Sequence, residues 1–228
     1  MGKLITLILA ALIAVVPTAA GAQARTKRLV DCATARCVAL TFDDGPSRYT
    51  TKLLDLLDEA GAKGTFFVVG QNTARYPDVL KRMVAEGHEL GSHTQNHANL
   101  TRLSAEKAYK EIMGPMPDLE AAGASVTLMR PPYGATNGTV GRAAERAGLA
   151  QILWTVDPED WRVRNSAVVA RRVLAHTKRG SIVLVHDIHP TTVAAMPKVI
   201  AELKRRGYEL VTVSELLGDR IKPGVRLP

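Results

Sequence analysis

Apolar and polar positions alternate in blocks along this chain, and the blocks have the lengths of strands and helices. Residues 38–42 read Val-Ala-Leu-Thr-Phe, an apolar run typical of a buried strand. Leucines then recur with helical spacing from 53 to 57, and Gly61 follows as a stop signal. A second apolar run, residues 65–69, ends at Gly70. The pattern predicts a strand, a helix and another strand in succession.

The same alternation continues toward the C-terminus. An amphipathic pattern at 79–84 predicts a helix that Gly87 ends. Pro115 and Pro117 predict that the next helix is short or broken. The residues after Gly218 are expected to form a peripheral extension. Further strands are expected at 126–129, 152–156, 182–185 and 210–213, with helices at about 139–147, 166–178 and 192–206 separating the later ones.

This order of elements predicts an α/β fold. Strand and helix alternate about seven times, which is typical of parallel strands joined by crossover helices. A closed or partly closed β/α barrel suits about 200 residues best, and an open doubly wound sheet is the alternative. Both architectures place functional residues at the carboxyl ends of strands. The polar residues that follow strand-like runs are Asp43, Asp44, His93, Arg130, Asp157, Asp160 and His186.

The first 24 residues differ in composition from the rest of the chain. Lys3 precedes an apolar run from 4 to 16, Pro17 breaks that run, and residues 22–24 read Ala-Gln-Ala. This is the pattern of a secretory signal peptide, and we expect cleavage after residue 24. An uncleaved membrane anchor is the alternative, but the run is shorter than the roughly 20 residues of a span. We therefore expect a secreted, periplasmic or cell-wall-associated protein without a stable membrane span after cleavage.

The net charge of +8 at pH 7 narrows the set of partners. A basic exported protein is attracted to anionic surfaces such as cell-wall polymers or lipid headgroups. Nucleic acid is not an expected partner, because export argues against it and no basic run is interleaved with aromatic residues. An ordinary solvated surface would explain the positive charge equally well. We expect a monomer, although the sequence carries no direct trace of oligomeric state.

The two cysteines, Cys32 and Cys37, are close in the sequence. In an oxidising compartment, such a pair is expected to form a disulfide. A loop this short adds only about 2 kcal/mol to stability in the chain-entropy model. Metal ligation by the two thiols is the alternative, but the sequence has no second cysteine pair to complete such a site.

Two motifs indicate a catalytic metal site. Asp43 and Asp44 are adjacent carboxylates at the end of a predicted strand, where a cation or an arginine would relieve their repulsion. His93 and His97 have the i, i+4 spacing that places both imidazoles on one face of a helix. Taken singly, the motifs could be a solvated turn and two unrelated surface histidines. Together, two histidines and one aspartate could bind an ion and leave positions open for water and substrate, while the other aspartate could accept a proton.

Three further motifs contain candidate functional residues. Arg130 precedes two prolines, and its guanidinium can hold a carboxylate in a fixed orientation. Trp161 follows a cluster of acids and suits a wall that packs against a sugar ring. His186 ends an apolar strand, where a histidine with a carboxylate partner can serve as a general acid. Each also has a purely structural interpretation: a proline-rich loop, a rim tryptophan and a satisfied core histidine.

Together, these motifs resemble those of the polysaccharide deacetylases, carbohydrate esterase family 4, which carry the NodB homology domain. The motifs, in order, are Thr-Phe-Asp-Asp-Gly-Pro at 41–46, His-Thr-x-x-His at 93–97, Arg-Pro-Pro-Tyr-Gly at 130–134, Asp-x-x-Asp-Trp at 157–161 and Leu-x-His-Asp at 184–187. The resemblance extends from Cys37 to Leu217. The expected division of the chain is a signal peptide (1–24), an N-terminal segment (25–36), a catalytic domain (37–218) and a C-terminal tail (219–228).

The resemblance implies a deformed β/α barrel and a role for each motif. It implies that Asp44, His93 and His97 bind a divalent metal, and zinc or cobalt best matches these ligands. By the same resemblance, Asp43 is a general base oriented by Arg130, and His186 is a general acid tuned by Asp160. The backbone N–H of Tyr133 would donate to an oxyanion, and Trp161 and Leu184 would line an acetyl pocket.

The implied activity is hydrolysis of N-acetyl groups on a polysaccharide such as peptidoglycan or chitin oligosaccharide. An acetylxylan esterase with the same site is the nearest alternative, because an activated water can attack amides and esters alike. An inactive carbohydrate-binding module would not need the acid–base pair of Asp43 and His186, and a small-molecule amidohydrolase would need a closed pocket. Gln95 and Ala98 replace an aromatic residue and a proline that many members carry, which leaves substrate preference open.

Overall fold

Strand β1 (Cys37–Asp43) is buried along its whole length, as its apolar run predicts, and has a parallel strand on each side in the sheet. The computed structural model describes Gly2 and residues 30–228. The expected signal peptide thus lies outside the described residues except for Gly2. The strand order is β6 (Ile182–His186), β1, β2 (Thr65–Val68), β3 (Glu89–Ser92), β4 (Leu128–Met129), β5 (Ala150–Ile152) and β8 (Arg226–Leu227), and β7 (Glu209–Val211) pairs with the start of β1.

The sheet curves into a deformed barrel. Val156 forms an isolated parallel bridge with Val183, so the segment after β5 reaches β6 at the other end of the strand order. The N–H of Leu184 donates to the carbonyl of Val156 at 2.9 Å, and the N–H of Thr155 donates to the carbonyl of Ile182 at 2.9 Å. This curvature confirms the predicted barrel in preference to an open doubly wound sheet.

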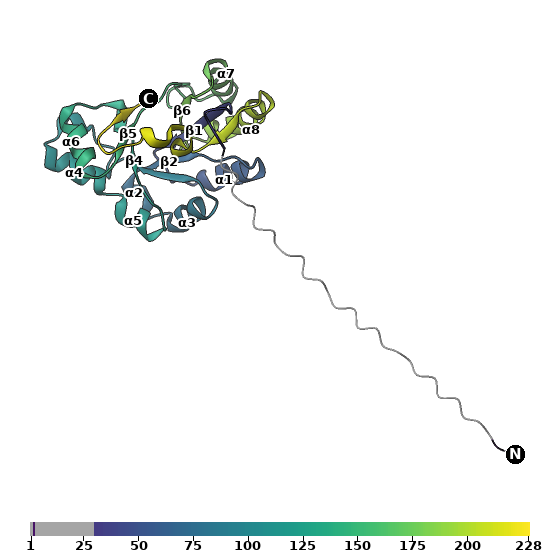
Figure 1. Cartoon of the computed structure of the whole chain (residues 1–228), viewed down its shortest axis with the longest axis horizontal. Helices are drawn as coiled ribbons and strands as arrows, with labels where there is room; N and C mark the ends of the chain where they lie inside the picture. The colour runs from purple at the N-terminus through teal and green to yellow at the C-terminus, as the bar shows by residue number, and fades with distance from the viewer. Residues whose placement is uncertain (1, 3–29) are drawn as a thin grey trace.

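Helices cover the outside of the sheet (Figure 1). They are α1 (Thr50–Glu59), α2 (Gly70–Thr73), α3 (Pro77–Ala85), α4 (Ala105–Met113), α5 (Met116–Ala121), α6 (Gly138–Arg146), α7 (Ser166–His176), α8 (Pro190–Arg205) and α9 (Val213–Leu217). Asn137 and Asn165 cap α6 and α7, because their side chains accept hydrogen bonds from free N–H groups of the first turn. The separation of α4 from α5 confirms the break predicted from Pro115 and Pro117.

Three expected segments differ from the structure. The strand expected at 152–156 is divided into the end of β5 and the separate Val156 bridge. The strand expected at 210–213 ends early, because Thr212 caps α9 and forms a capping box with Glu215. The C-terminal tail is not peripheral. Its Leu227 is buried, and β8 pairs with β5 and extends the sheet.

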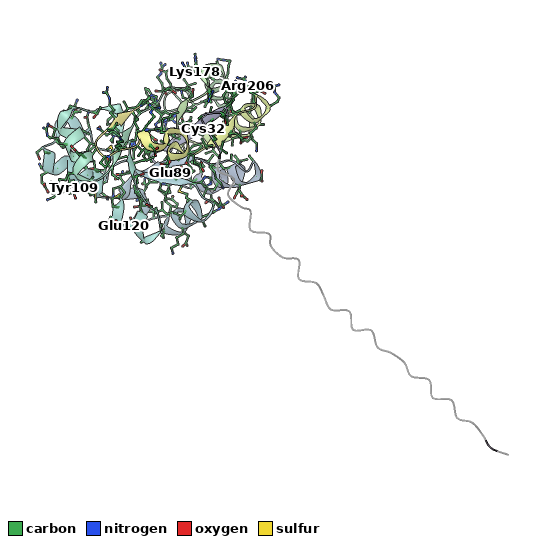
Figure 2. All side chains as sticks on the ribbon, in the orientation of Figure 1. Cys32, Glu89, Tyr109, Glu120, Lys178 and Arg206 are labelled. Atoms are coloured by element: carbon green, nitrogen blue, oxygen red, sulfur yellow. A yellow bond between two sulfur atoms is a disulfide. The ribbon has the colours of Figure 1, made fainter. Side chains whose placement is uncertain are left out.

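The segment before β1 is fixed to the barrel by the expected disulfide. Cys32 and Cys37 are bonded, and Cys32 is labelled in Figure 2. The guanidinium of Arg179 also donates to the carbonyl of Cys32 at 3.1 Å, which adds a second connection to the loop before β6. Within residues 30–228, no helix has the length and apolar character needed to cross a membrane.

Candidate active site

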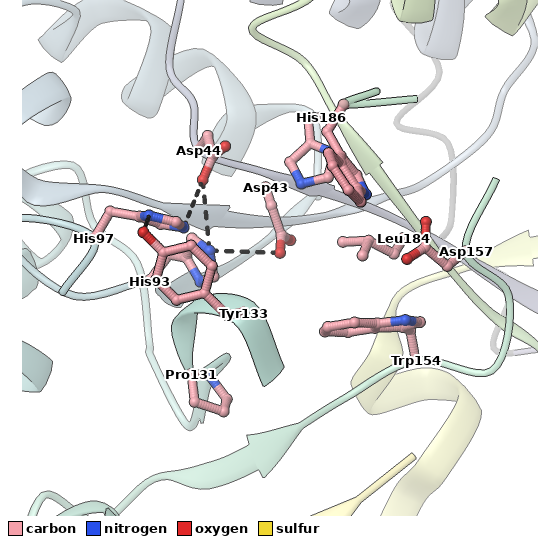
Figure 3. Close-up of a pocket in the computed structure, with 11 residues that line it drawn as sticks. Asp43, Asp44, His93, His97, Pro131, Tyr133, Trp154, Asp157, Leu184 and His186 are labelled. Atoms are coloured by element: carbon pink, nitrogen blue, oxygen red, sulfur yellow. Dashed lines mark hydrogen bonds and ion pairs between the residues drawn. The ribbon is translucent and has the colours of Figure 1, made fainter. Parts of the chain in front are cut away.

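A cavity of about 400 Å³ opens at the carboxyl ends of the strands. The loops that follow successive strands form its walls, as expected for a parallel barrel. Its lining residues are Asp43, Asp44, His93, His97, Pro131, Tyr133, Trp154, Asp157, Trp161, Leu184 and His186 (Figure 3). Arg130 and Asp160 are fully buried next to lining residues. The structure therefore brings all the residues predicted for catalysis, metal binding and substrate binding into one place.

Asp44, His93 and His97, here called the histidine–aspartate cluster, direct their ligand atoms toward one another (Figure 3). The Nε2 atoms of His93 and His97 lie 3.5 and 3.4 Å from Oδ1 of Asp44. Two ligands held about 2 Å from one tetrahedral zinc ion are roughly 3.3 Å apart. Oδ1 of Asp44 is buried and accepts no hydrogen bond from the described residues. A buried carboxylate oxygen that faces two imidazole nitrogens fits a divalent cation.

The two histidines do not lie on a helix, which corrects the expectation drawn from their spacing. Residues 93–97 belong to the loop that follows β3. Thr94 and His97 have φ values of 69° and 56°, and such left-handed residues reverse the chain where a helix would continue. The reversal brings the two imidazole rings to a centroid distance of 5.0 Å. The two imidazoles therefore do lie together, but a loop and not a helix brings them there.

Hydrogen bonds at Nδ1 orient both imidazoles of the cluster. Nδ1 of His93 lies 2.7 Å from the carbonyl oxygen of Arg130. A carbonyl can only accept, so Nδ1 carries the proton and Nε2 presents its lone pair to the cluster. Burial lowers the pKa of His93, although Asp43 and Asp44 oppose this shift, and the ring stays neutral as a ligand must. Nδ1 of His97 lies 3.2 Å from the hydroxyl of Tyr133.

Asp43 is the second carboxylate of the cavity, and only 2% of its surface is exposed. Its Oδ1 accepts a hydrogen bond from Nη1 of Arg130 at 2.7 Å. Its Oδ2 lies 3.6 Å from Nε2 of His93. The arginine therefore engages one oxygen, and the other oxygen faces the histidine–aspartate cluster.

Arg130 is fully buried, and several acceptors fix its guanidinium. Nη1 also donates to Oγ1 of Thr41 at 2.7 Å, while Nε and Nη2 donate to the carbonyls of Ile152 and Leu153 at 3.1 and 2.8 Å. The guanidinium stacks on the ring of Phe67 at 4.2 Å. Burial lowers the pKa of Arg130, and the charge of Asp43 opposes this shift. The orientation of Asp43 is thus determined by a rigid neighbour.

His186 and Asp160 form a second pair, in which Asp160 is fully buried and His186 is partly buried. Nδ1 of His186 lies 2.8 Å from Oδ1 of Asp160, while Oδ2 accepts from the His186 backbone N–H at 2.8 Å and from Oγ1 of Thr192 at 2.6 Å. Burial alone would lower the pKa of His186. The hydrogen bond and charge of Asp160 outweigh it and raise that pKa to about 9. His186 therefore carries a proton at neutral pH, and its Nε2 is not engaged by Asp160.

Asp187 was assigned no role from the sequence, but it connects two loops of the site. Oγ of Ser47 donates to the carbonyl of Asp187 at 2.9 Å, and the hydroxyl of Thr50 donates to its carboxylate. Gly45 packs against this carboxylate and leaves no room for a side chain. Burial raises the pKa of Asp187 to about 7, although the hydrogen bond from Thr50 opposes the shift. The loop carrying Asp44 is thereby fixed to the loop that follows His186 at the end of β6.

Aromatic and apolar side chains form the rest of the wall. Tyr133 and Trp161 are 68% and 49% exposed, while Leu184 is buried. Exposed aromatic faces beside a cavity are suited to packing against a sugar. Trp154 was not predicted as a site residue, but it lines the cavity, and its ring lies 5.7 Å from the guanidinium of Arg130. Its position within the strand-like run 152–156 was the available signal.

The fold and the site define a class of protein. It is a parallel β/α barrel with the carboxylate and the protonated histidine that a hydrolase needs, and with a cluster able to hold a metal. Sequence comparison then identifies the family. The profile described as polysaccharide deacetylase matches residues 31–152, and the chain belongs to that family.

Individual relatives agree with this assignment. The chain is 44% identical over 189 residues to the peptidoglycan-N-acetylglucosamine deacetylase PgdA of Listeria monocytogenes, a match covering 82% of this chain and 40% of that protein. It is 40% identical over 202 residues to a chitin deacetylase of Arthroderma benhamiae, covering 82% and 53% respectively. A solved structure of a deacetylase with substrate superposes with a TM-score of 0.83 at 44% identity and covers 87% of this chain and 100% of that one. The chain thus spans less than half the length of the Listeria relative.

Proposed function

We propose that this chain is an exported, divalent-metal-dependent deacetylase that removes N-acetyl groups from a polysaccharide. The observation that carries the proposal is that two paired groups, Asp43 with Arg130 and His186 with Asp160, lie beside one histidine–aspartate cluster. In one pair Arg130 orients Asp43, and in the other Asp160 raises the pKa of His186. A binding module has no use for either pair, whereas hydrolysis needs a base and an acid on the same substrate.

The histidine–aspartate cluster would hold the metal. Two imidazoles and one carboxylate match zinc or cobalt best, with positions left open for water and substrate. When bound, the ion would lower the pKa of a water molecule and polarise the acetyl carbonyl.

Asp43 acts as the general base in this proposal. Arg130 holds Oδ1, so Oδ2 is the oxygen that accepts the proton of the attacking water. The backbone N–H of Tyr133 donates to the oxyanion that develops on the acetyl group. Tyr133 has a φ of 63°, within the 3₁₀ turn η2 (Pro132–Gly134), and the two prolines before it stiffen this backbone.

His186 acts as the general acid. Its proton is present at neutral pH because its pKa is raised to about 9. Asp160 engages Nδ1, which leaves Nε2 to protonate the departing amine. The products are acetate and a free amino group on the sugar.

Peptidoglycan is the substrate that the relatives and the charge favour. The Listeria relative is a peptidoglycan-N-acetylglucosamine deacetylase, and the basic chain is attracted to anionic cell-wall polymers. The exposed rings of Tyr133 and Trp161 offer faces for sugar rings, with Leu184 and Trp161 lining the acetyl pocket. Chitin oligosaccharide is the second candidate, favoured by the similarity to a chitin deacetylase.

Acetate release from peptidoglycan, chitin oligosaccharide and acetylxylan tests the proposal, with and without a chelator followed by added zinc or cobalt. We expect chelator-sensitive release from an N-acetylated polymer, restored by the metal. Release from acetylxylan alone would replace amide hydrolysis by ester hydrolysis. A chain that binds metal but releases no acetate from any polymer would contradict the proposal and favour a binding module.

A further inference from the structure

One loop supports both histidines of the histidine–aspartate cluster. The loop consists of residues 130–134 and contains two consecutive prolines. Its first carbonyl, that of Arg130, accepts the Nδ1 proton of His93 at 2.7 Å. Its Tyr133 hydroxyl lies 3.2 Å from Nδ1 of His97. The loop proposed to supply the oxyanion donor therefore also contacts the cluster from the side opposite Asp44, because each ring directs Nε2 toward that carboxylate.

We propose that the Tyr133 side chain is a positioning residue for His97, and that its hydroxyl determines how tightly the cluster binds a divalent metal. This inference rests on the metal site of the proposed function. The two rings lie edge to face, with centroids 4.7 Å apart and planes at 68° (Figure 3). The Tyr133 ring is 68% exposed, so burial of apolar surface contributes little to holding it there.

The backbone on both sides of this contact is held in an uncommon conformation. Tyr133 and His97 have φ values of 63° and 56°, a left-handed conformation that residues other than glycine adopt only where the surroundings enforce it. The surrounding loop maintains this geometry. The N–H of Gly134 donates to the carbonyl of Pro131 at 3.0 Å, and Gly134 packs so closely on Trp154 that an added Cβ would lie 2.9 Å from that ring. The turn thus directs the tyrosine hydroxyl toward His97.

The hydrogen-bond partners of the two histidines differ in whether they can donate as well as accept. The Arg130 carbonyl only accepts, so it holds His93 in the tautomer that ligates through Nε2. A hydroxyl can accept or donate. With a metal bound, Nδ1 of His97 donates to the Tyr133 oxygen and Nε2 is free to ligate. Without a metal, Nε2–H can face Oδ1 of Asp44 at 3.4 Å while the Tyr133 hydroxyl donates to Nδ1. Tyr133 can therefore keep the His97 ring in one orientation in both states.

Tyr133→Phe tests this inference, because it removes the hydroxyl but keeps the ring and the backbone N–H. We expect the dissociation constant for zinc, measured by competition with a chromophoric chelator, to rise roughly tenfold, as when other outer partners of metal-binding histidines are removed. The absorption spectrum of the cobalt-loaded variant should also shift, since the ligand orientation changes. Tyr109→Phe is the matched control. That tyrosine packs on Arg146 at 3.8 Å and is labelled in Figure 2, and its variant should bind zinc like the parent.

The outcomes separate this inference from the proposed function. Equal zinc affinity and identical cobalt spectra in Tyr133→Phe and the parent would overturn it. A parent chain that binds no metal would overturn both this inference and the proposed metal site. A parent chain that binds metal and releases no acetate would overturn the proposed function alone, provided that Tyr133→Phe still weakens binding.

Discussion

Replacing Asp43 by asparagine separates its proposed role as a base from metal binding. The substitution keeps the shape of the side chain and an oxygen for Nη1 of Arg130, but it removes the proton acceptor. Loss of a general base lowers turnover by about 10²–10⁴-fold. Asp43 is not a member of the histidine–aspartate cluster, so metal content should stay near that of the parent chain.

The stability cost of Asp43→Asn follows from what remains around Arg130. Deleting one partner of a buried ion pair costs about 3–5 kcal/mol. Here the guanidinium keeps its bonds to Thr41, Ile152 and Leu153, and the asparagine oxygen can still accept. We therefore expect the substitution to replace one charge-assisted hydrogen bond by a neutral one. This should lower the free energy of unfolding by about 2 kcal/mol.

Three measurements on one preparation check this prediction: acetate release from chitin oligosaccharide, metal content by atomic absorption, and unfolding in urea. Asp58→Asn makes the same charge change at an exposed position of α1 and serves as the control. Parallel loss of metal and activity would show that Asp43 is a ligand and refute its role as base. Activity within a few-fold of the parent would refute the assignment directly.

Three further predictions concern the remaining titratable groups. His97→Ala should lower zinc occupancy at limiting zinc, and unchanged occupancy would remove this residue from the cluster. Because the pKa of His186 is raised to about 9 and the proposed acid must be protonated, kcat/KM should fall as pH rises through about 9. Asp160→Asn should move that descending limb to lower pH, and an unmoved limb would contradict the pairing. Burial, with Lys63 and Arg82 nearby, lowers the pKa of His88 to about 3, so below pH 6.5 the unfolded chain binds a proton that the folded chain does not. The contribution of His88 to the free energy of unfolding should therefore be fully present above pH 6.5. Below that pH it should decline by up to about 1.4 kcal/mol per pH unit. Urea unfolding of His88→Gln should show a shallower decline, and equal slopes would contradict this origin.

Much of the fold could be predicted because the apolar runs, the prolines and the glycines mark the same elements as the alternation of strand and helix. The apolar run of β1, the prolines between α4 and α5 and the glycine stop signals mark elements that the structure contains. Parallel strands end at one edge of the sheet, so polar residues after successive strands had to converge. Asp43, Arg130 and His186 were therefore expected to lie close together, although they are far apart in the chain.

Other features depend on contacts that no local pattern encodes. The spacing of His93 and His97 fits a helix, yet left-handed φ values place them in a loop. The tail after Gly218 looked peripheral, but Leu227 is buried and its strand pairs with β5.

The sequence by itself determined which residue types meet at the strand ends, since alternation of strand and helix forces a parallel sheet. Only the tertiary structure decided how those residues are oriented. It engages Oδ1 of Asp43 with Arg130 and places the hydroxyl of Tyr133 beside His97. It also leaves Oδ1 of Asp44 without a hydrogen-bond donor among the described residues. The physical reason is that hydrogen bonds between loops distant in sequence depend on backbone turns and burial, which periodicity does not specify.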